Sequence, residues 1–475
     1  MSVPNYNEKQ PIAQNSQTVN QNSAESKYIK MTAEPVQKLV VTMAVPTIVS
    51  MLVTTFYNMA DTYFVSQINT EATAAVGLVF PLMTLMQAIG FMFGHGSGNF
   101  MSRALGNKEY DKAAVMASTG FFSALFFGVI LMVGGLIFLD PLCVLLGSPE
   151  EIIDVTKSYT KYILCGAPFI MSTFVLNNQM RFQGNAFYAM IGTVSGAVLN
   201  VVLDPVFIFV LDMKVAGAAL ATIISQFVGF WLLVIGTTRP GNIHLSIKNF
   251  RPSGWTYGQI FKGGFPSLCR QGITTVSTVC LNLMAGVYGV TAIAAMSIVS
   301  RVSMFFYSAL IGFGQGFQPV CGFNYGAKRF DRVLKAFWFS VKTAVVALLV
   351  LSAIQFAFAP QIMRLFRKDD LEVIQIGTAA IRFQSVVLPL ASWVVMSNMM
   401  IQTIGHTLKA SILAVARQGL FFIPMLIILS PLGVLGLEMT QMTADILAFI
   451  LAFVIGMSEI KNLKSEMESM KVYGG

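Results

Sequence analysis

Long stretches without a charged residue recur along the whole chain, and they constrain its fold more than any other feature. A helix needs about 20 predominantly apolar residues to cross the hydrocarbon core of a bilayer, whereas buried helices of soluble proteins are usually shorter. The last stretch is the shortest and spans that core only if it extends back to Met439 across Asp445. The sequence therefore predicts twelve transmembrane helices, within the charge-free stretches 39–60, 72–102, 113–139, 162–180, 182–203, 215–238, 271–300, 302–327, 343–363, 383–408, 418–437 and 446–458.

The composition argues against a soluble protein, and the motifs argue against an enzyme. Hydrophobic residues make up 55% of the 475 residues and charged residues only 11%, with a mean hydropathy of +0.68, whereas soluble domains carry roughly a quarter charged residues. The five cysteines are scattered without metal or redox spacing, so we interpret them as packing residues. The glycines of "GHGSG" and "GFGQG" follow no predicted strand, and no P-loop, H-E-x-x-H or G-x-S-x-G motif occurs. We expect no catalytic activity and no cofactor.

Basic residues gather in alternate connections between the apolar stretches. By the positive-inside rule, this pattern places both termini in the cytoplasm. Arg364, Arg367 and Lys368 are an exception, partly balanced by Asp369 and Asp370. The net charge of +9 is therefore a topology signal in a multi-pass membrane protein, and we expect no nucleic-acid partner. The basic residues that carry the signal are Lys9, Lys27, Lys30, Lys38, Arg103, Lys108, Lys112, Arg181, Arg239, Lys248, Arg251, Lys262, Lys328, Arg329, Arg332, Lys335, Lys409, Lys461, Lys464 and Lys471.

The second half of the chain repeats the first. A shift of 220 residues, which becomes 221 after one inserted residue, aligns the two halves. Because each half has an even number of spans, both halves enter the membrane in the same orientation, and a pseudo-two-fold axis runs along the membrane normal. The matched pairs include Pro46 with Pro266, "GNKEYDK" (106–112) with "GAKRFDR" (326–332), Asn177 with Asn398, and Gly184 with Gly405.

This repeat predicts an all-α membrane protein of two six-helix bundles. The polar start of the chain is rich in Asn, Gln and Ser and lacks the apolar core of a signal peptide, so we expect it to be disordered. The expected units are a disordered cytoplasmic tail (1–34), an N-terminal lobe (35–238), a cytoplasmic linker (239–257), a C-terminal lobe (258–458) and a second cytoplasmic tail (459–475).

Four motifs together resemble one transporter family. They are "YNMADTYFVSQ" after a proline in the first span, "GNKEYDK" after the second, "MRFQGNA" after the fourth and "LNVVLDP" in the fifth. They are similar to the multidrug and toxic compound extrusion (MATE) family, in particular to its DinF-like and MepA-like prokaryotic branch, over residues 35–457. The resemblance implies a monomeric twelve-helix antiporter that exports small organic cations and drugs across the bilayer in exchange for H⁺ or Na⁺.

The first half contains polar residues that its repeat mostly lacks. Asp61, Asn200 and Asp204 align with apolar residues, and only Thr222 aligns with another threonine, Thr443. Asn200 and Asp204 are four residues apart and share one helix face. Acids inside a membrane are functional by default, and oxygen ligands of this kind suit a hard cation. The alternative is structural: Asp61 lies at the headgroup level and Asp204 pairs with a basic side chain.

The resemblance assigns these four residues to the family's cation and proton site. Pro46 and Pro205 should bend the first and fifth spans by freeing the carbonyl groups of Thr42 and Val201. The resemblance also places Tyr57, Asn177 and Asn200 at the substrate cavity, although Tyr57 or Asn177 could equally form a hydrogen bond between helices.

The second half contains basic residues within its spans, namely Arg270, Lys342, Arg382 and Arg417. We expect most of them to extend toward a membrane interface, with one of them lining a cavity or pairing with Asp445. The leading hypothesis is a secondary exporter, because no ATP-binding segment is present. The alternatives are a flippase for a lipid-linked saccharide, whose cavity should be basic, and a channel or signalling protein without coupled transport.

Overall fold

The computed structural model describes residues 23–367 and 370–473, with side chains up to Met470. The described part is helical and contains no strand. The spans of the first half are α2 (Val36–Ser66), α3 (Thr70–Gly106), α4 (Tyr110–Ile137), α6 (Ile153–Phe182), α7 (Ala186–Pro205, continued by the π-helix η2, Val206–Val210) and α8 (Lys214–Thr237).

The second half has the same order of spans. They are α9 (Gly254–Val287), α10 (Val290–Gly326), α11 (Phe330–Ala357), α13 with η4 and α14 (Leu371–Val387, Leu388–Leu390 and Ala391–Ile404), α15 with the π-helix η5 and α16 (Thr407–Val415, Ala416–Phe421 and Phe422–Leu429), and α17 (Val434–Tyr473). Short helices in the connections complete the chain: α5 (Leu139–Leu145), η1 (Glu150–Ile152), η3 (Ile247–Asn249), α12 (Ala359–Phe366) and η6 (Ser430–Leu432).

Eleven helices of the described part are long and apolar enough to cross a membrane, and α9 is the twelfth span. It is 34 residues long but carries a run of Thr, Ser and Gln side chains. One of these, Gln271, donates a hydrogen bond to Gln87 of α3 at 2.9 Å. One polar residue of α9 thus bonds to the other half of the molecule, whereas Thr274 and Thr278 donate to carbonyl groups of their own helix. The predicted all-α, twelve-helix fold is confirmed.

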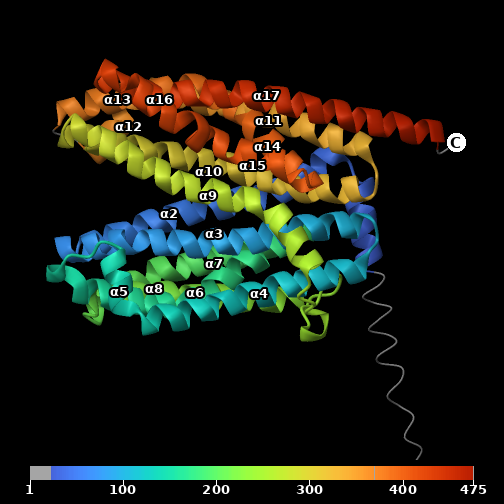
Figure 1. The fold of residues 1–475 in the computed structure, drawn as a ribbon, viewed down its shortest axis with the longest axis horizontal. Coiled ribbons are helices and arrows are strands. Elements are labelled where there is room, and N and C mark those ends of the chain that lie inside the picture. Colours follow the sequence, from blue (N-terminus) through green and yellow to red (C-terminus); the bar gives the residue numbers. More distant parts are fainter. Residues whose placement is uncertain (1–22, 368–369, 474–475) are drawn as a thin grey trace, which may run out of the picture.

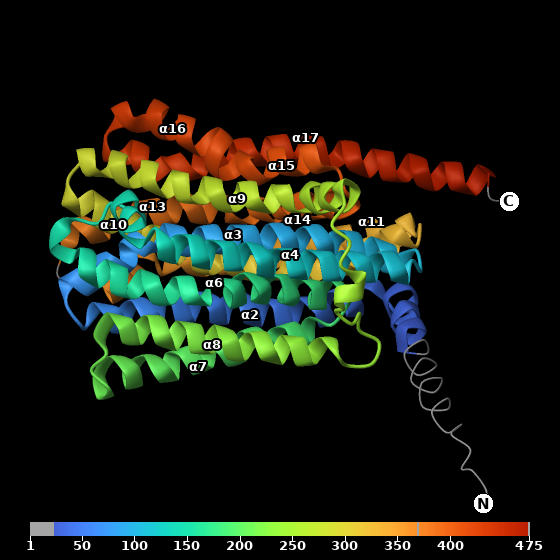
Figure 2. The ribbon, with the colours of Figure 1, turned by 60° about the horizontal axis from the view of Figure 1, so that its bottom comes forward.

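The two halves form two bundles, here called the N-lobe (α2–α8) and the C-lobe (α9–α17). Figure 1 shows the N-lobe in blue to green below the C-lobe in yellow to red, and Figure 2 shows the same separation from another side. The lobes meet through α2 against α10 and α3 against α9. The start of α2 and the end of α17 lie at the same end of the bundle, which we call the termini end; we call the opposite end the far end.

Glycines allow the lobes to touch backbone to backbone in the half nearer the termini end. A Cβ atom on Gly96 of α3 would lie 2.1 Å from the carbonyl oxygen of Ile260, and one on Gly264 of α9 would lie 1.9 Å from that of Met92. The same holds for Gly316 of α10 against the backbone of Ala44. Side chains at these positions would push the lobes apart, so this part of the interface depends on glycine.

The hydrogen bonds between the lobes lie in the middle of the molecule and in its half nearer the termini end. Arg103 donates to the carbonyl oxygen of Thr403, and Thr55 donates to Ser308 at 2.9 Å. Within the described residues, no hydrogen bond joins the lobes nearer the far end than the Thr55–Ser308 and Gln87–Gln271 pairs. The lobes are thus held together at the termini end and are free of polar links at the far end.

Three expectations need correction. The tail over 1–34 is only partly outside the described residues: residues 23–33 are helical, Met31 and Thr32 are buried, and Arg329 donates to the carbonyl oxygen of Thr32 at 3.2 Å.

The second tail continues α17 as far as Tyr473, and its first residue, Glu459, is buried beside Lys409. The C-lobe begins four residues before position 258, because Ser253 caps α9 by accepting a hydrogen bond from the Thr256 N–H.

Arg103 and Arg181 also differ from the sequence interpretation, which counted both as residues of basic connections. Both lie inside helices, in α3 and α6, and Arg181 is only 1% exposed. Each donates to a group of the other lobe. These two arginines join the lobes, and their charge need not report the side of the membrane.

Candidate ion-binding site

The four polar residues predicted from the repeat meet inside the N-lobe. Asn200 and Asp204 lie one turn apart near the end of α7, and Asn200 donates from its amide to Asp204 Oδ1 at 3.3 Å and to Thr222 Oγ1 of α8 at 3.4 Å. All three side chains are buried. Asp61 of α2 completes the group, since its carboxylate interacts electrostatically with that of Asp204. The structure therefore brings together residues from three helices.

Three oxygen atoms of this group are buried without a hydrogen-bond partner. They are Asp61 Oδ1, Asn200 Oδ1 and Asp204 Oδ2. Buried polar atoms are almost always paired, and an unpaired carboxylate oxygen in an apolar environment is costly. The described residues contain no cluster of three or more His, Cys, Asp or Glu side chains that could hold a metal ion. Two carboxylates with an amide and a hydroxyl suit a proton or one monovalent cation instead.

The local helix geometry follows from Pro205. The α-helix α7 ends at this proline and continues as the π-helix η2, because Pro205 cannot donate a backbone hydrogen bond to Val201. Pro46, where the sequence predicts the other bend, lies within α2. This helix is continuous on both sides of the proline. Ser50 donates its hydroxyl to the Pro46 carbonyl oxygen at 2.9 Å.

Two tyrosines lie beside the acids. Tyr57, one turn before Asp61 on α2, and Tyr159 on α6 both interact electrostatically with Asp61 and Asp204. Tyr159 is fully buried, and its hydroxyl lies 3.9 Å from Met83 Sδ. Sequence reasoning missed Tyr159 because Lys157 and Lys161 flank it, so the segment resembles a connection. The signal that could have found it is the position of Tyr159 one turn before the long apolar part of α6.

Asn177 lies away from this group. Its amide donates to the carbonyl oxygen of Ala189 at 3.0 Å and to Thr193 Oγ1 at 2.7 Å, which ties α6 to α7. Its repeat partner Asn398 makes the same bond, to the carbonyl oxygen of Ala410 at 2.7 Å, between α14 and α15. A contact kept in both lobes is explained by helix packing.

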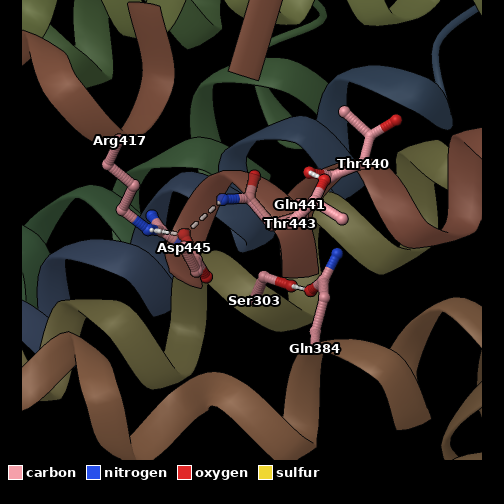
Figure 3. Close-up of polar contacts among 7 residues, drawn as sticks. All are labelled: Ser303, Gln384, Arg417, Thr440, Gln441, Thr443 and Asp445. Carbon is pink, nitrogen blue, oxygen red and sulfur yellow. Dashed lines mark hydrogen bonds and ion pairs between the residues drawn. The ribbon is translucent and has the colours of Figure 1, made fainter. Parts of the chain in front are cut away.

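The corresponding region of the C-lobe holds a paired acid (Figure 3). Arg417 donates from Nε to Asp445 Oδ1 at 2.7 Å, and Gln441 donates to the same oxygen at 2.7 Å. The guanidinium of Arg417 also lies over the Tyr307 ring, 4.3 Å from its centroid. The expected pairing of Asp445 with a basic residue of the C-lobe is confirmed, and Arg417 does not extend toward a membrane interface.

Several other polar residues of the C-lobe are bonded, packed on a ring or exposed, whereas Gln318 and Thr403 have buried atoms without a partner. Ser303 donates to Gln384, and Thr443, the repeat partner of Thr222, bonds only to backbone carbonyl groups of its own helix. Lys342 is exposed, and Arg382 lies over the ring of Phe356. Asp61 and Asp204 of the N-lobe thus each have a buried oxygen without a partner, whereas both oxygens of Asp445 accept hydrogen bonds; Glu438 of α17 is a further buried acid of the C-lobe.

The family model called MatE matches two segments of the chain, residues 46–206 and 266–428. The chain belongs to this family. The two matched segments begin 266 − 46 = 220 residues apart, which is the offset of the internal repeat. The resemblance to MATE transporters proposed from four motifs is therefore confirmed.

Curated MATE proteins are similar over most of the chain. The multidrug export protein MepA of Staphylococcus aureus (strain NCTC 8325 / PS 47) is 28% identical over 426 residues, which cover 89% of this chain and 93% of MepA. MepA of Staphylococcus saprophyticus is 28% identical over 425 residues, which cover 88% of this chain and 93% of that MepA.

Solved MATE structures share the arrangement of helices. One described as the outward-facing conformation of a multidrug resistance MATE transporter has a TM-score of 0.87 at 27% identity and covers 92% of this chain and 98% of its own. A transporter from Pyrococcus furiosus, described by the reverse polarity of its binding pocket, has a TM-score of 0.86 at 28% identity, with the same coverage. The MATE fold thus extends over nearly the whole chain.

Proposed function

We propose that this MATE transporter exports amphipathic organic cations, and that an inward flux of H⁺ or Na⁺ through the Asp61–Asp204 group drives the export. The unpartnered buried oxygens of Asp61, Asn200 and Asp204 carry this proposal, because they need a proton or a cation to complete them. The similar MepA proteins are named for multidrug export. The site lies on the N-lobe alone, as expected for one coupling ion site per transporter.

The coupling step follows from the cost of charge in an apolar environment. H⁺ or Na⁺ that reaches the acids neutralises at least one carboxylate and removes the cost of its burial. Asp61 belongs to α2, whereas Asp204 belongs to α7. A change in charge therefore alters the repulsion between these two helices, and with it the packing of α2 against α10 of the other lobe. Organic cation and coupling ion compete for the same negative charge, which links the two fluxes.

The state of the lobes fits export at the far end. The glycine contacts close the termini end, and among residues 23–367 and 370–470 no polar link joins the lobes at the far end. A solved relative of this fold is described as outward-facing, and two others as the bent and the straight conformation of one transporter. We assign the far end to the outside of the cell and both termini to the cytoplasm of a bacterial inner membrane, with a monomer as the working unit.

The test is transport by purified protein in vesicles, with pH and Na⁺ gradients imposed independently. A fluorescent organic cation such as ethidium should move against the gradient that drives it, and collapse of that gradient should stop transport. Transport that continues at the same rate without either gradient would refute antiport.

The alternative, a flippase for a lipid-linked saccharide, is less well supported. Its substrate carries pyrophosphate, which needs basic groups at the site of recognition. The unpartnered atoms of the N-lobe site are oxygen atoms of acids and an amide, which repel that group. Scrambling of a fluorescent pyrophosphate lipid by the purified protein, at a rate above that of empty vesicles, would favour this alternative.

A further inference from the structure

The segment that precedes α2 crosses from one lobe to the other at the termini end. Residues 23–33 form a helix beside the start of α2 (Figure 2). Pro35 separates this helix from α2, because the residue before a proline disfavours the helical conformation. We call residues 23–34 the N-terminal strap. Side chains of the strap contact the N-lobe and its last carbonyl groups contact the C-lobe, so it joins the lobes in addition to α2.

Two side chains of the strap attach it to the N-lobe. Lys27 Nζ donates to the Gly241 carbonyl oxygen at 2.9 Å and to Asn242 Oδ1 at 2.8 Å. Asn242 in turn donates to a backbone carbonyl group of α8 at 2.8 Å, which fixes it to the N-lobe. Met31 is only 1% exposed and packs against Gly184, between α6 and α7, where an added Cβ atom would lie 3.2 Å from Met31 Sδ.

The last carbonyl groups of the strap are bound by the C-lobe. The final carbonyl groups of a helix have no partner within it, and the helix dipole favours basic side chains there. Three side chains of the C-lobe supply the partners: Asn324 donates to the carbonyl oxygen of Met31 at 3.2 Å, Arg329 to that of Thr32 at 3.2 Å, and Arg332 to that of Glu34 at 2.6 Å.

The internal repeat shows that only one lobe carries these donors. In the N-lobe, the positions 220 residues earlier are Ala104, Glu109 and Lys112. Alanine has no side-chain donor, and the other two residues pair with each other at 2.9 Å. The contacts to the strap are therefore not a consequence of the duplicated fold, and they mark a difference between the two lobes.

The two sets of contacts leave the strap no slack. Lys27 and Met31 are four residues apart on one helix, which is a distance of about 6 Å along its axis. Opening of the termini end moves the C-lobe contacts away from the N-lobe contacts. The strap can follow only one lobe, so the contacts at one of its ends must break.

We propose that the N-terminal strap is a latch that holds the termini end closed, and that its release precedes every opening of that end. The latch stabilises the state that is open at the far end relative to the state that is open at the termini end. This inference rests on the proposed transport only in requiring that the termini end opens, and it holds for any coupling ion or substrate.

The test measures the distance between the lobes after the strap is loosened at either end. Spin labels at the exposed positions 112 and 335, on a cysteine-free background in nanodiscs, report opening by pulsed electron paramagnetic resonance. The double variant Arg329→Gln/Arg332→Gln frees the C-lobe end, and Met31→Ala loosens the N-lobe end. Each should raise the ratio of open to closed molecules by about tenfold, through the loss of two charge-assisted hydrogen bonds or of a buried side chain. An unchanged ratio in both would overturn the proposal.

A combined variant distinguishes a latch from two independent effects. A strap detached at one end no longer joins the lobes, so Met31→Ala added to the double arginine variant should cause no further opening. Additive opening would contradict the latch. Lysine in place of both arginines should retain part of the closed population, because lysine can still donate to a carbonyl group.

Lys328→Gln is the matched control, because it removes a positive charge from an exposed side chain of the same connection. It should leave the ratio unchanged, and opening as large as in the double arginine variant would assign the effect to surface charge and contradict the latch. The distance measurement needs no transported molecule. Its failure would therefore count against the latch alone, whereas failure of gradient-driven transport in vesicles would count against the export function.

Discussion

Asp61 ends the first apolar stretch of the chain, and its Oδ1 atom is buried without a partner. Asp204 lies in the same condition on a different helix, whereas Asp445 of the other lobe accepts hydrogen bonds from two side chains. Asp61 and Asp204 therefore differ in type from Asp445. A paired acid holds helices together, and an unpartnered acid leaves a charge that an ion can neutralise.

We predict that Asp61→Asn and Asp204→Asn each abolish gradient-driven efflux. An amide cannot release a proton and binds a cation poorly, and loss of either residue breaks the same site, so the double variant should be no worse than the singles. Efflux is measured at matched amounts of protein in the membrane. Asp212→Asn is the control, because Asp212 has φ 49° in a connection, a conformation that asparagine tolerates. Normal efflux by Asp61→Asn would refute the coupling role.

We predict that Asn177→Ala and Asn398→Ala have matching effects. Each removes the same side-chain-to-backbone hydrogen bond between neighbouring spans, and Asn177→Ala also removes a bond to Thr193, so each should lower the free energy of unfolding by about 1 kcal/mol. Thermal unfolding in detergent measures this loss, and efflux per folded molecule should change little. A selective loss of efflux in Asn177→Ala would restore the expected role of Asn177 at the substrate cavity.

At the scale of elements, helix α9 is a span of this fold although its sequence is less apolar than that of the other spans. Its length suits a span, yet its polar residues keep it below the apolarity of the other eleven. It lies against α3 of the N-lobe, where Gln271 bonds to Gln87 and Gly264 allows close backbone contact. An isolated helix of this composition would be a poor membrane span, so α9 depends on its neighbours.

We predict that Gly264→Ala separates the lobes at the termini end and Gly272→Ala does not. Both glycines belong to α9, but an added Cβ on Gly264 would lie 1.9 Å from the Met92 carbonyl oxygen, whereas none would meet an atom within 4 Å at Gly272. Spin labels at positions 112 and 335 on a cysteine-free background report the distance between lobes. An unchanged distance in Gly264→Ala would show that the contact yields without moving the lobes.

We predict that the helix at 23–33 docks more tightly as pH rises through about 7. Lys27 Nζ lies 2.9 Å from the Gly241 carbonyl oxygen and 2.8 Å from Asn242 Oδ1, and burial, aided by Lys30, lowers the pKa of Lys27 to about 7. The docked state then holds fewer protons than the undocked state between pH 7 and the ordinary pKa of lysine near 10.4, so higher pH favours docking.

Hydrogen exchange of residues 23–33 measures this docking. Protection should be greater at pH 8 than at pH 6 after correction for the intrinsic exchange rate. Lys27→Met should remove that difference, while Lys38→Met, at an exposed residue, should keep it. An equal pH dependence in Lys27→Met would contradict the assignment to Lys27.

At the scale of the whole molecule, the duplicated lobes have diverged in their charges. The N-lobe keeps unpartnered acid oxygens, and the C-lobe holds a paired acid. The pseudo-symmetry builds the two bundles, and the differences between them give the transporter its chemistry. The proposed function therefore depends on the positions at which the two lobes differ in sequence.

We predict that both termini and the linker between lobes face the cytoplasm. An impermeant thiol reagent applied to intact cells should fail to label single cysteines at positions 248 and 465 but should label one at position 140. Lys248 is an exposed residue of the linker, and Asp140 is exposed at the far end. Permeabilised cells control for reactivity. Labelling of position 248 from outside would reverse the orientation.

The sequence by itself determined the number of spans, the repeat and the identity of the acids. Apolar length and the register of a duplication are properties of the chain read in order, and they do not depend on contacts between distant residues. The pairing of Arg417 with Asp445 could be anticipated only as one of several pairings, because 28 residues separate them.

Only the tertiary structure decided which polar groups lack partners. Arg181 resembled a residue of a connection and Tyr159 a residue beside one, yet both are buried. Whether a buried charge is compensated depends on neighbours that packing brings from far along the chain, and a linear pattern carries no record of them.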